Sequence, residues 1–260
     1  MAQTKIGLSM LFCLGEGFPL MVKHLEELET HYVELVDDGL HTLDDKRAEA
    51  LNRIAGSLNI EYTIHAPLAD INIAASDRNL RRFVMKRLEK SMQYAHQLDC
   101  LLWIFHPGSR SAISSFYPGL DWQVNLESIR TLLALGRKHN VRIAIENIPE
   151  IFPSLLKSVN DFSKLYEELG EDIGMVLDVG HANVNSQTKE FMDKFGDTIV
   201  HIHVSDNDGK QDSHFGIGKG SVDWQGFAKS VKRMHFRGII MVESILDVKD
   251  SLRNLRELLS

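Results

Sequence analysis

The feature that most constrains the fold is an alternation of short apolar runs with longer helical stretches, which occurs eight times along the chain. The runs are rich in β-branched residues and cover residues 5–11, 32–38, 60–65, 101–106, 142–146, 174–178, 200–204 and 238–243. Eight such repeats without a long linker predict an α/β fold, a closed parallel (β/α)8 TIM barrel, with residues 1–260 forming a single domain. The alternative, a doubly wound open sheet, would usually have fewer strands and a glycine-rich first turn.

The stretches between the runs have the signals of helices. We expect helices to begin near positions where a side chain or a proline can start the first turn, namely Pro19, Asp44, Asp77, Asp121, Asn160, Ser186, Asp223 and Asp247. The stretch 79–97 predicts one apolar face, because its apolar residues recur at helical spacing: Leu80, Phe83, Val84, Leu88, Met92, Tyr94 and Ala95.

Length and composition indicate an ordinary globular protein. The 260 residues are 43% hydrophobic and 25% charged, which allows a full core without a disulfide. No apolar stretch approaches the roughly 18 residues of a membrane span, and the N-terminus lacks the long apolar region of a signal peptide. We expect Cys13 and Cys100 to be buried, reduced thiols, and these features together favour a cytoplasmic protein without a membrane partner.

The strand ends carry side chains that bind metals. Six of the eight runs end on or near such a residue, namely His65, His106, Glu146, Asp178, His203 and Glu243. All strands of a parallel barrel point the same way, so these residues are expected to meet at one mouth. The residues two positions earlier share their direction and are mostly small or apolar, as a barrel interior requires. His201 is the exception, and we interpret it as a core histidine with its hydrogen bonds satisfied rather than as a deeper part of the site.

Two further segments extend this set. His181 follows Asp178 by three residues, and the loop after the seventh run carries Asp212 and His214. The candidate set of nine contains four carboxylates but no Lys or Arg at the strand ends, and buried carboxylates without a counter-charge are costly. A bound divalent cation resolves that cost. Mixed imidazole and carboxylate ligands suit Zn, Mn, Fe or Co better than Ca, and the charge balance predicts one to three ions per chain.

At these residues the chain resembles the xylose isomerase-like TIM-barrel superfamily, which includes sugar isomerases, epimerases and the endonuclease IV type of AP endonuclease. The resemblance covers nearly the full length and rests on the segments IHAP, FHPG, ENIP, LDVGHAN, HIHVSD and D-x-H-x-x-x-G-x-G in the family's order. For the epimerase branch it implies one metal held by Glu146, Asp178, His203 and Glu243, with the two glutamates as acid and base. For the endonuclease IV branch it implies three zinc ions held by all nine residues.

The sequence departs from both branches. The first run reads GLSMLFCLGEG, DVGH stands where endonuclease IV has Asp-Thr-Cys-His, and DSH stands where it has Asp-Arg-His. The arginine that many epimerases carry soon after the seventh-strand histidine is not found in HVSDNDGKQ. The net charge of −7 also fits poorly with binding of duplex DNA.

The leading hypothesis is a metal-dependent isomerase or epimerase that acts on a sugar or sugar phosphate. Glu146 and Glu243 would move the proton, and His181 would hold a substrate hydroxyl or bind metal. Further candidates for substrate contact are the apolar walls Phe12, Phe18 and Trp122, and Lys219 in a loop suited to phosphate. The alternative hypothesis is hydrolysis of abasic DNA by a three-zinc site, and only there would DNA be a partner. A third interpretation is a barrel that binds metal but has lost catalytic activity.

Overall fold

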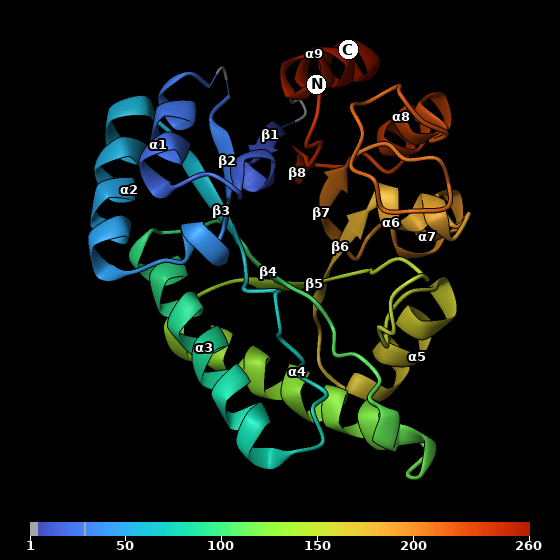
Figure 1. The fold of residues 1–260 in the computed structure, drawn as a ribbon. Helices are drawn as coiled ribbons and strands as arrows, with labels where there is room; N and C mark the ends of the chain where they lie inside the picture. Colours follow the sequence, from blue (N-terminus) through green and yellow to red (C-terminus); the bar gives the residue numbers. More distant parts are fainter. Residues whose placement is uncertain (1–4, 29) are drawn as a thin grey trace.

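The computed structural model describes residues 5–28 and 30–260, which form a closed barrel of eight parallel strands (Figure 1). Each strand pairs with its neighbours in sequence, and β1 pairs with β8 to close the barrel. The strands are β1 (Lys5–Ser9), β2 (Tyr32–Val36), β3 (Glu61–His65), β4 (Trp103–Phe105), β5 (Ile143–Glu146), β6 (Gly174–Asp178), β7 (Ile199–Val204) and β8 (Ile239–Val242). Seven of the predicted runs contain one of these strands, and the run 200–204 covers all of β7 except Ile199, so the predicted (β/α)8 barrel is confirmed.

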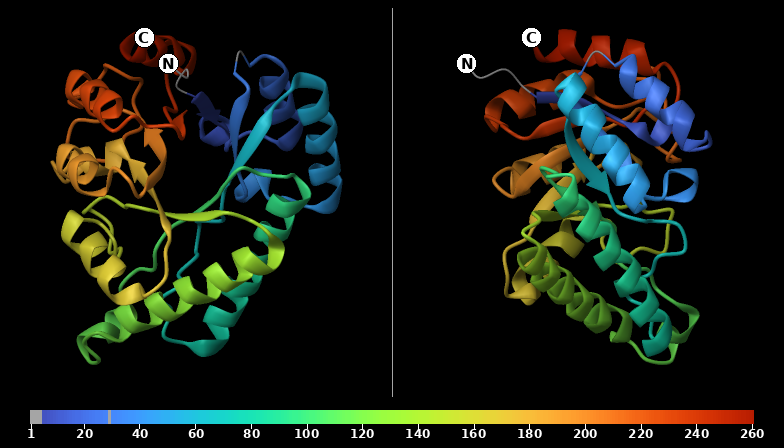
Figure 2. Two further views of the ribbon diagram at one scale, coloured as in Figure 1. Left: turned by 180° about the vertical axis from the view of Figure 1, so that it is seen from behind. Right: turned by 90° about the vertical axis from the view of Figure 1, so that its left-hand side faces the viewer.

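The helices lie outside the barrel and enclose it, as the views in Figure 2 show. They are α1 (Phe18–Glu26), α2 (Asp45–Leu58), α3 (Arg78–Gln97), α4 (Leu120–His139), α5 (Val159–Leu169), α6 (Val179–Val184), α7 (Thr188–Phe195), α8 (Trp224–Arg233) and α9 (Val248–Leu259). Three short 3-10 helices lie in the loops that follow strands, namely η1 (Met10–Cys13), η2 (Gly39–His41) and η3 (Ala112–Ser115).

Most helices begin where the sequence predicts. The side chains of Asp44, Asp77 and Asp223 accept hydrogen bonds from backbone N–H groups in the first turns of α2, α3 and α8. The helix expected near Ser186 begins at Thr188 instead, because the short helix α6 precedes it. Ser186 has a φ of 54° and lies in the turn between the two helices.

Apolar side chains fill two regions. The larger core lies between the barrel and its helices, and a small separate cluster inside the barrel consists of Leu102, Ile104, Ala144 and Val176. Three of these four residues lie two positions before a strand-end ligand candidate, as the alternation of side chains along a strand predicts. These residues form a packed apolar floor beneath one part of the mouth, on the side of β4, β5 and β6.

The predicted apolar face of 79–97 is correct only in part. Val84, Leu88 and Met92 are buried, whereas Leu80 and Phe83 are 54% and 73% exposed. α3 has 20 residues, which corresponds to about 30 Å of helix, and its first turns lie away from the barrel in the lower part of Figure 1. The spacing of apolar residues therefore predicts the helix, but it does not predict which part of the helix is covered by neighbouring elements.

Both cysteines are free thiols, as predicted. Cys13 is buried and Cys100 is half-buried, and burial raises the pKa of Cys13 to about 12, so it stays protonated at neutral pH. Within residues 5–28 and 30–260, no helix has both the length and the apolar character needed to span a bilayer.

Candidate metal centre

The structure brings four strand-end residues into one buried group, which we call the central group: Glu146, Asp178, His203 and Glu243. They come from β5, β6, β7 and the residue after β8, and each offers a ligand atom within 4.8 Å of the others. His203 Nδ1 lies 3.0 Å from Glu146 Oε1 and 3.5 Å from Glu243 Oε2. None of the four is more than 4% exposed. Three carboxylates and one imidazole thus face a common point.

A second group shares Glu146 with the central group. His65 at the end of β3 and His106 after β4 each place Nε2 3.2 Å from Glu146 Oε2, and we call these three residues the His65 group. The two imidazoles meet edge to face, with their centroids 4.8 Å apart. Because one oxygen of Glu146 faces each group, this carboxylate is positioned to bridge two ions.

The third group, here the His181 group, consists of His181, Asp212 and His214. Asp212 Oδ2 lies 3.1 Å from His181 Nε2 and 3.3 Å from His214 Nε2. His181 also lies 3.7 Å from both Glu146 and Asp178, so the three groups adjoin. All nine residues predicted from the sequence therefore meet at the barrel mouth.

The short helix α6 positions His181. Asp178 Oδ1 accepts a hydrogen bond of 2.6 Å from the backbone N–H of His181 and so caps the helix that begins directly after β6. A Cβ atom on Gly180 would lie 2.8 Å from Ser205 Oγ and 3.2 Å from Asp178 Oδ1. The segment DVGH therefore turns tightly enough to place two ligand candidates three residues apart on the same side.

The loop after β7 is held by another buried carboxylate that the sequence did not single out. Asp206 accepts hydrogen bonds from the backbone N–H groups of Gly218 and Val222 and from the indole of Trp224. These bonds hold the loop in a folded conformation. On the same loop, His214 Nδ1 donates a hydrogen bond of 3.0 Å to the backbone carbonyl of Glu243. His214 has a φ of 46°, an unusual conformation for a side chain of this size.

The donor set fits divalent metal. Nδ1 of His65, His181 and His214 each lies within 3.0 Å of a backbone carbonyl, which can only accept a hydrogen bond. These nitrogens therefore carry the proton and leave Nε2 free as a ligand atom, an arrangement typical of metal-binding histidines. In the described part of the chain, the ion pairs of these carboxylates involve only histidines, and two buried oxygens, Asp178 Oδ2 and Asp212 Oδ1, lack a partner.

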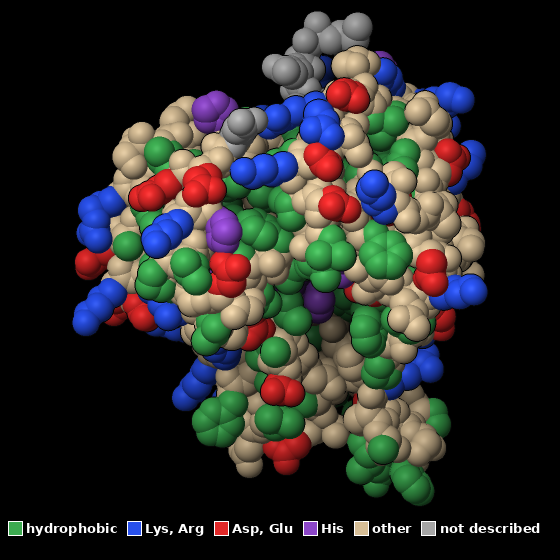
Figure 3. Space-filling model, turned by 45° about the horizontal axis from the view of Figure 1, so that its top comes forward, with side chains coloured by type: hydrophobic (Ala, Val, Ile, Leu, Met, Phe, Trp, Pro, Cys, Tyr) green, Lys and Arg blue, Asp and Glu red, His purple; other side chains and the backbone are tan. Residues whose placement is uncertain are grey.

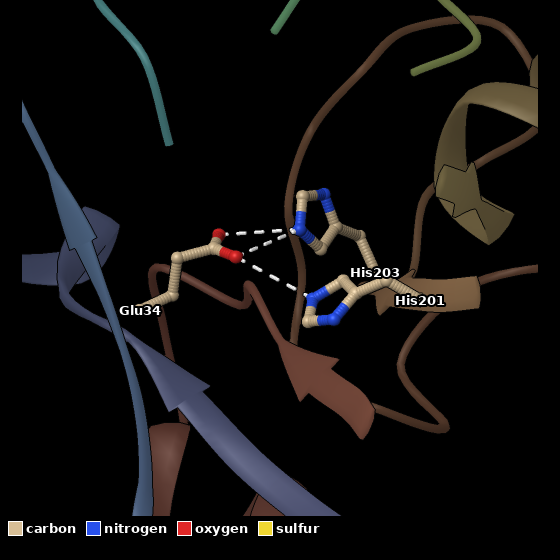
Figure 4. Close-up of side chains that lie close together, drawn as sticks. All are labelled: Glu34, His201 and His203. Carbon is tan, nitrogen blue, oxygen red and sulfur yellow. Dashed lines mark hydrogen bonds and ion pairs between the residues drawn. The ribbon is translucent and has the colours of Figure 1, made fainter. Parts of the chain in front are cut away.

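Glu34 is a site residue that was not among those predicted from the sequence. This residue of β2 is fully buried beneath the central group, and its carboxylate points across the barrel toward His201 and His203 (Figure 4). A charged residue at an inward position of the apolar strand 32–36 was the signal that could have identified it. The interpretation of His201 as a satisfied core histidine is wrong, because its Nε2 is 3.4 Å from Glu34 Oε2 and has no hydrogen-bond partner.

The candidates for substrate contact lie in different places. Phe12 is half-buried in η1, where its ring meets His24 edge to face, and Phe18 begins α1 under the guanidinium of Arg47. Lys219 is exposed on the loop after β7. Trp122 lies elsewhere: its indole hydrogen bonds to Glu168 of α5, so it contacts the helical layer rather than any of the three groups.

The protonation of the metal-free site predicts a decrease in stability at alkaline pH. Burial opposes the charged form of His65, but the hydrogen bond and charge of Glu146 outweigh it and raise the pKa to about 9. Burial raises the pKa of Glu243 to about 8, and Glu34 and Glu146 add to this against the opposing charge of His203. Both folded-state pKa values exceed the ordinary ones. The stability that they provide is therefore complete at low pH and is lost as the pH rises through them.

We therefore expect the melting temperature of the chelator-treated protein to decrease between pH 6.5 and pH 9. Calorimetry across this range measures it, with the metal-loaded protein in the same buffers as the control. Bound metal replaces the protons, so the loaded protein should show a smaller decrease. A melting temperature of the metal-free protein that rises over this range would contradict the prediction.

The face drawn in Figure 3 is hollowed in its middle, and imidazole side chains lie within the hollow. Around it, acidic and basic side chains are interspersed, and neither sign forms a large area on this face. Exposed apolar side chains gather toward the lower end of the view.

The sequence matches a family of proteins that is described by this fold. Residues 22–258 match the xylose isomerase-like TIM barrel family, and the chain belongs to it. An uncharacterised protein of Methanocaldococcus jannaschii, MJ1614, is 31% identical to this chain, with 90% of this chain and 92% of that protein covered. A solved structure described as a D-tagatose 3-epimerase-like protein has a TM-score of 0.90 at 23% identity, with 98% of both chains covered. That likeness shows the shared fold.

Two curated relatives of lower similarity carry the names of different reactions. Fructoselysine 3-epimerase of Escherichia coli is 20% identical and covers 77% of this chain, which spans 73% of that protein. Probable endonuclease 4 of Aquifex aeolicus is 24% identical, with 66% of each chain covered. The relatives of this chain thus include proteins named for each of the two chemistries that the sequence suggested.

Proposed function

We propose that this protein is a divalent-metal-dependent isomerase or epimerase of a sugar or sugar phosphate. The observation that carries the proposal is the pair of glutamates in the central group. Glu146 and Glu243 come from β5 and the end of β8 and approach the same atom, His203 Nδ1, at 3.0 and 3.5 Å. Two carboxyl groups that face one point from different strands can act on two sides of a substrate carbon.

The two carboxyl groups have pKa values that are displaced in opposite directions. Burial alone would raise the pKa of Glu146, but the charge of His203 and hydrogen bonds from three histidines hold it well below its ordinary value. Burial raises the pKa of Glu243 to about 8. Opposite shifts of two neighbouring pKa values are typical of a pair in which one carboxyl group accepts a proton and the other donates one.

These properties define the roles of the residues. A bound divalent ion would polarise a carbonyl and an adjacent hydroxyl and so acidify the C–H bond between them. Glu146, ionised at neutral pH, accepts the proton from that carbon. The carboxyl group of Glu243 would deliver a proton taken from solvent to the other side of the carbon, and exchange with solvent restores both carboxyl groups. His181 holds a substrate hydroxyl or binds metal, and Phe12 and Lys219 are the remaining candidates for substrate contact.

The similarities support this assignment. The solved structure with a TM-score of 0.90 is described as D-tagatose 3-epimerase-like, and one curated relative is named fructoselysine 3-epimerase. The metal would be Zn, Mn or Co, held first by the central group. We propose one ion there, with the other two groups as sites for a second and third.

A second candidate function, hydrolysis of abasic DNA, is favoured by one observation. The nine ligand candidates form three adjoining groups, which suits three zinc ions and phosphate ester chemistry. The net charge of −7 and the interspersed charges in Figure 3 oppose it, because DNA phosphates require Lys and Arg.

Exchange of solvent deuterium into substrate distinguishes the two. In D2O, protein loaded with Mn²⁺ or Zn²⁺ should incorporate deuterium next to the carbonyl of a ketose or ketose phosphate, as measured by NMR. Chelation should reduce the rate to that of the protein-free sample, and added metal should restore it. The proposal fails if no sugar in such a panel exchanges. Cleavage of an oligonucleotide with one abasic site, together with three ions per chain by elemental analysis, would establish the second candidate instead.

A further inference from the structure

His203 is held differently from the other ligand histidines. Three of them donate Nδ1–H to a backbone carbonyl and present Nε2 to the site. His203 is reversed, since Nδ1 faces Glu146 and Glu243 while Nε2 faces away from them. Its Nε2 lies 3.1 and 3.2 Å from the two oxygens of Glu34. A side-chain carboxylate thus occupies the place that a backbone carbonyl has at the other three.

Glu34 is fixed in that place by its surroundings. It is fully buried and pairs in register with Ser9 of β1 and Thr63 of β3. Thr63 Oγ1 donates a hydrogen bond of 3.0 Å to Glu34 Oε2, and His201, on the same side of β7 as His203, meets His203 edge to face at 5.0 Å. The rigid strands therefore leave the carboxylate little freedom to move.

The carboxylate of Glu34 determines which ring nitrogen of His203 carries the proton. Both oxygens of Glu34 face His203 Nε2, and Oε2 also lies 3.4 Å from His201 Nε2. An ionised carboxylate only accepts hydrogen bonds, so it selects the form of His203 that carries a proton on Nε2. That form leaves the Nδ1 lone pair directed at the central group. A hydrogen bond to a carboxylate also makes the ring a stronger ligand.

We propose that Glu34 is a positioning residue of the metal centre, which holds His203 in the orientation and tautomer that present Nδ1 to a divalent ion in the central group. The proposal rests on the metal site of the proposed function but not on the identity of the substrate. Glu34, His201 and His203 also have ligand atoms within 4.8 Å of one another. However, all three are at most 1% exposed, so a water or substrate that would complete the coordination of an ion has no access to them.

The test is the affinity for metal, measured with Mn²⁺ by titration calorimetry or competition with a chelator. Glu34→Gln is expected to weaken binding by about 10- to 100-fold, the usual effect of removing such a partner. Asp37→Asn is the matched control. Asp37 is a buried carboxylate just after the same strand, but it pairs with Arg87 rather than a histidine. This control should lower the melting temperature and change the affinity by less than about twofold.

A second variant and an NMR measurement test the role of Glu34 independently of Glu34→Gln. If Glu34→Gln does not fold, Thr63→Val removes the hydrogen bond to Glu34 while keeping the carboxylate, and a smaller loss of affinity is expected. In the Zn²⁺-loaded protein, ¹⁵N NMR should show His203 with metal on Nδ1 and a proton on Nε2. Unchanged affinity in folded Glu34→Gln, or metal on Nε2, would overturn the proposal. A wild-type protein that binds no metal would instead overturn the proposed function.

Discussion

Glu146→Gln is expected to lose most of its bound metal and to reduce the rate of proton exchange by about 1,000-fold or more, equivalent to about 4 kcal/mol of transition-state stabilisation. The reason is that Glu146 belongs to two groups at once. One oxygen faces His203, and the other faces His65 and His106. An amide offers only one neutral oxygen, so it cannot replace a charged carboxylate between two groups. The metal content is measured by elemental analysis and the rate by deuterium incorporation.

A matched control distinguishes the loss of a metal ligand from the general effect of replacing a glutamate with glutamine. Glu150 lies four residues later, in the loop after β5, has a side chain 62% exposed, and pairs with Lys157. Glu150→Gln makes the same chemical change outside the three groups, so metal content and activity should stay within about twofold of the wild type, as for most surface substitutions. If Glu146→Gln keeps the full metal content of the wild type, the assignment of the central group is wrong.

Glu243→Gln is expected to retain metal but to reduce the rate of proton exchange by about 100- to 10,000-fold, the range attributed to general acid–base catalysis. Glu243 is the more distant of the two carboxylates from His203 Nδ1, and in the metal-free site its pKa is raised to about 8. Glu146, Asp178 and His203 remain to hold an ion. The amide keeps the shape of the side chain but cannot take up or release the proton.

The comparison that matters is between rate and metal content. Metal content should stay close to that of the wild type while the maximal rate falls, in contrast to Glu146→Gln, in which both decrease. Glu243→Asp provides a second test, because the shorter carboxyl can still transfer a proton and should recover part of the rate. An active Glu243→Gln variant with normal metal content would exclude Glu243 from the proton transfer.

The number of strands and the location of the ligand candidates were predictable for a single reason. In a parallel barrel every strand ends at the same mouth, so a residue's place at the end of a run already gives its place in space. This rule brought together residues as distant in sequence as His65 and Glu243. Side-chain alternation likewise predicted the apolar floor formed by Ile104, Ala144 and Val176.

Other features depend on neighbours that the sequence does not identify. Leu80 and Phe83 have helical spacing, but the barrel ends before it reaches them, so they are exposed. Trp122 follows a strand-end segment, yet its indole turns toward α5. The direction of a side chain on a helix depends on what lies beside that helix, and spacing along the chain does not contain this information.

The sequence by itself determined that this chain is a (β/α)8 barrel with nine ligand-type residues at one mouth, because strand periodicity and chain direction are local properties. Only the tertiary structure divided those nine residues into three groups and placed Glu146 in two of them. It also placed Glu34 of β2 against His203 of β7, a contact between residues 169 positions apart. Such contacts follow from the closure of the barrel, which brings β2 and β7 to face each other across the interior.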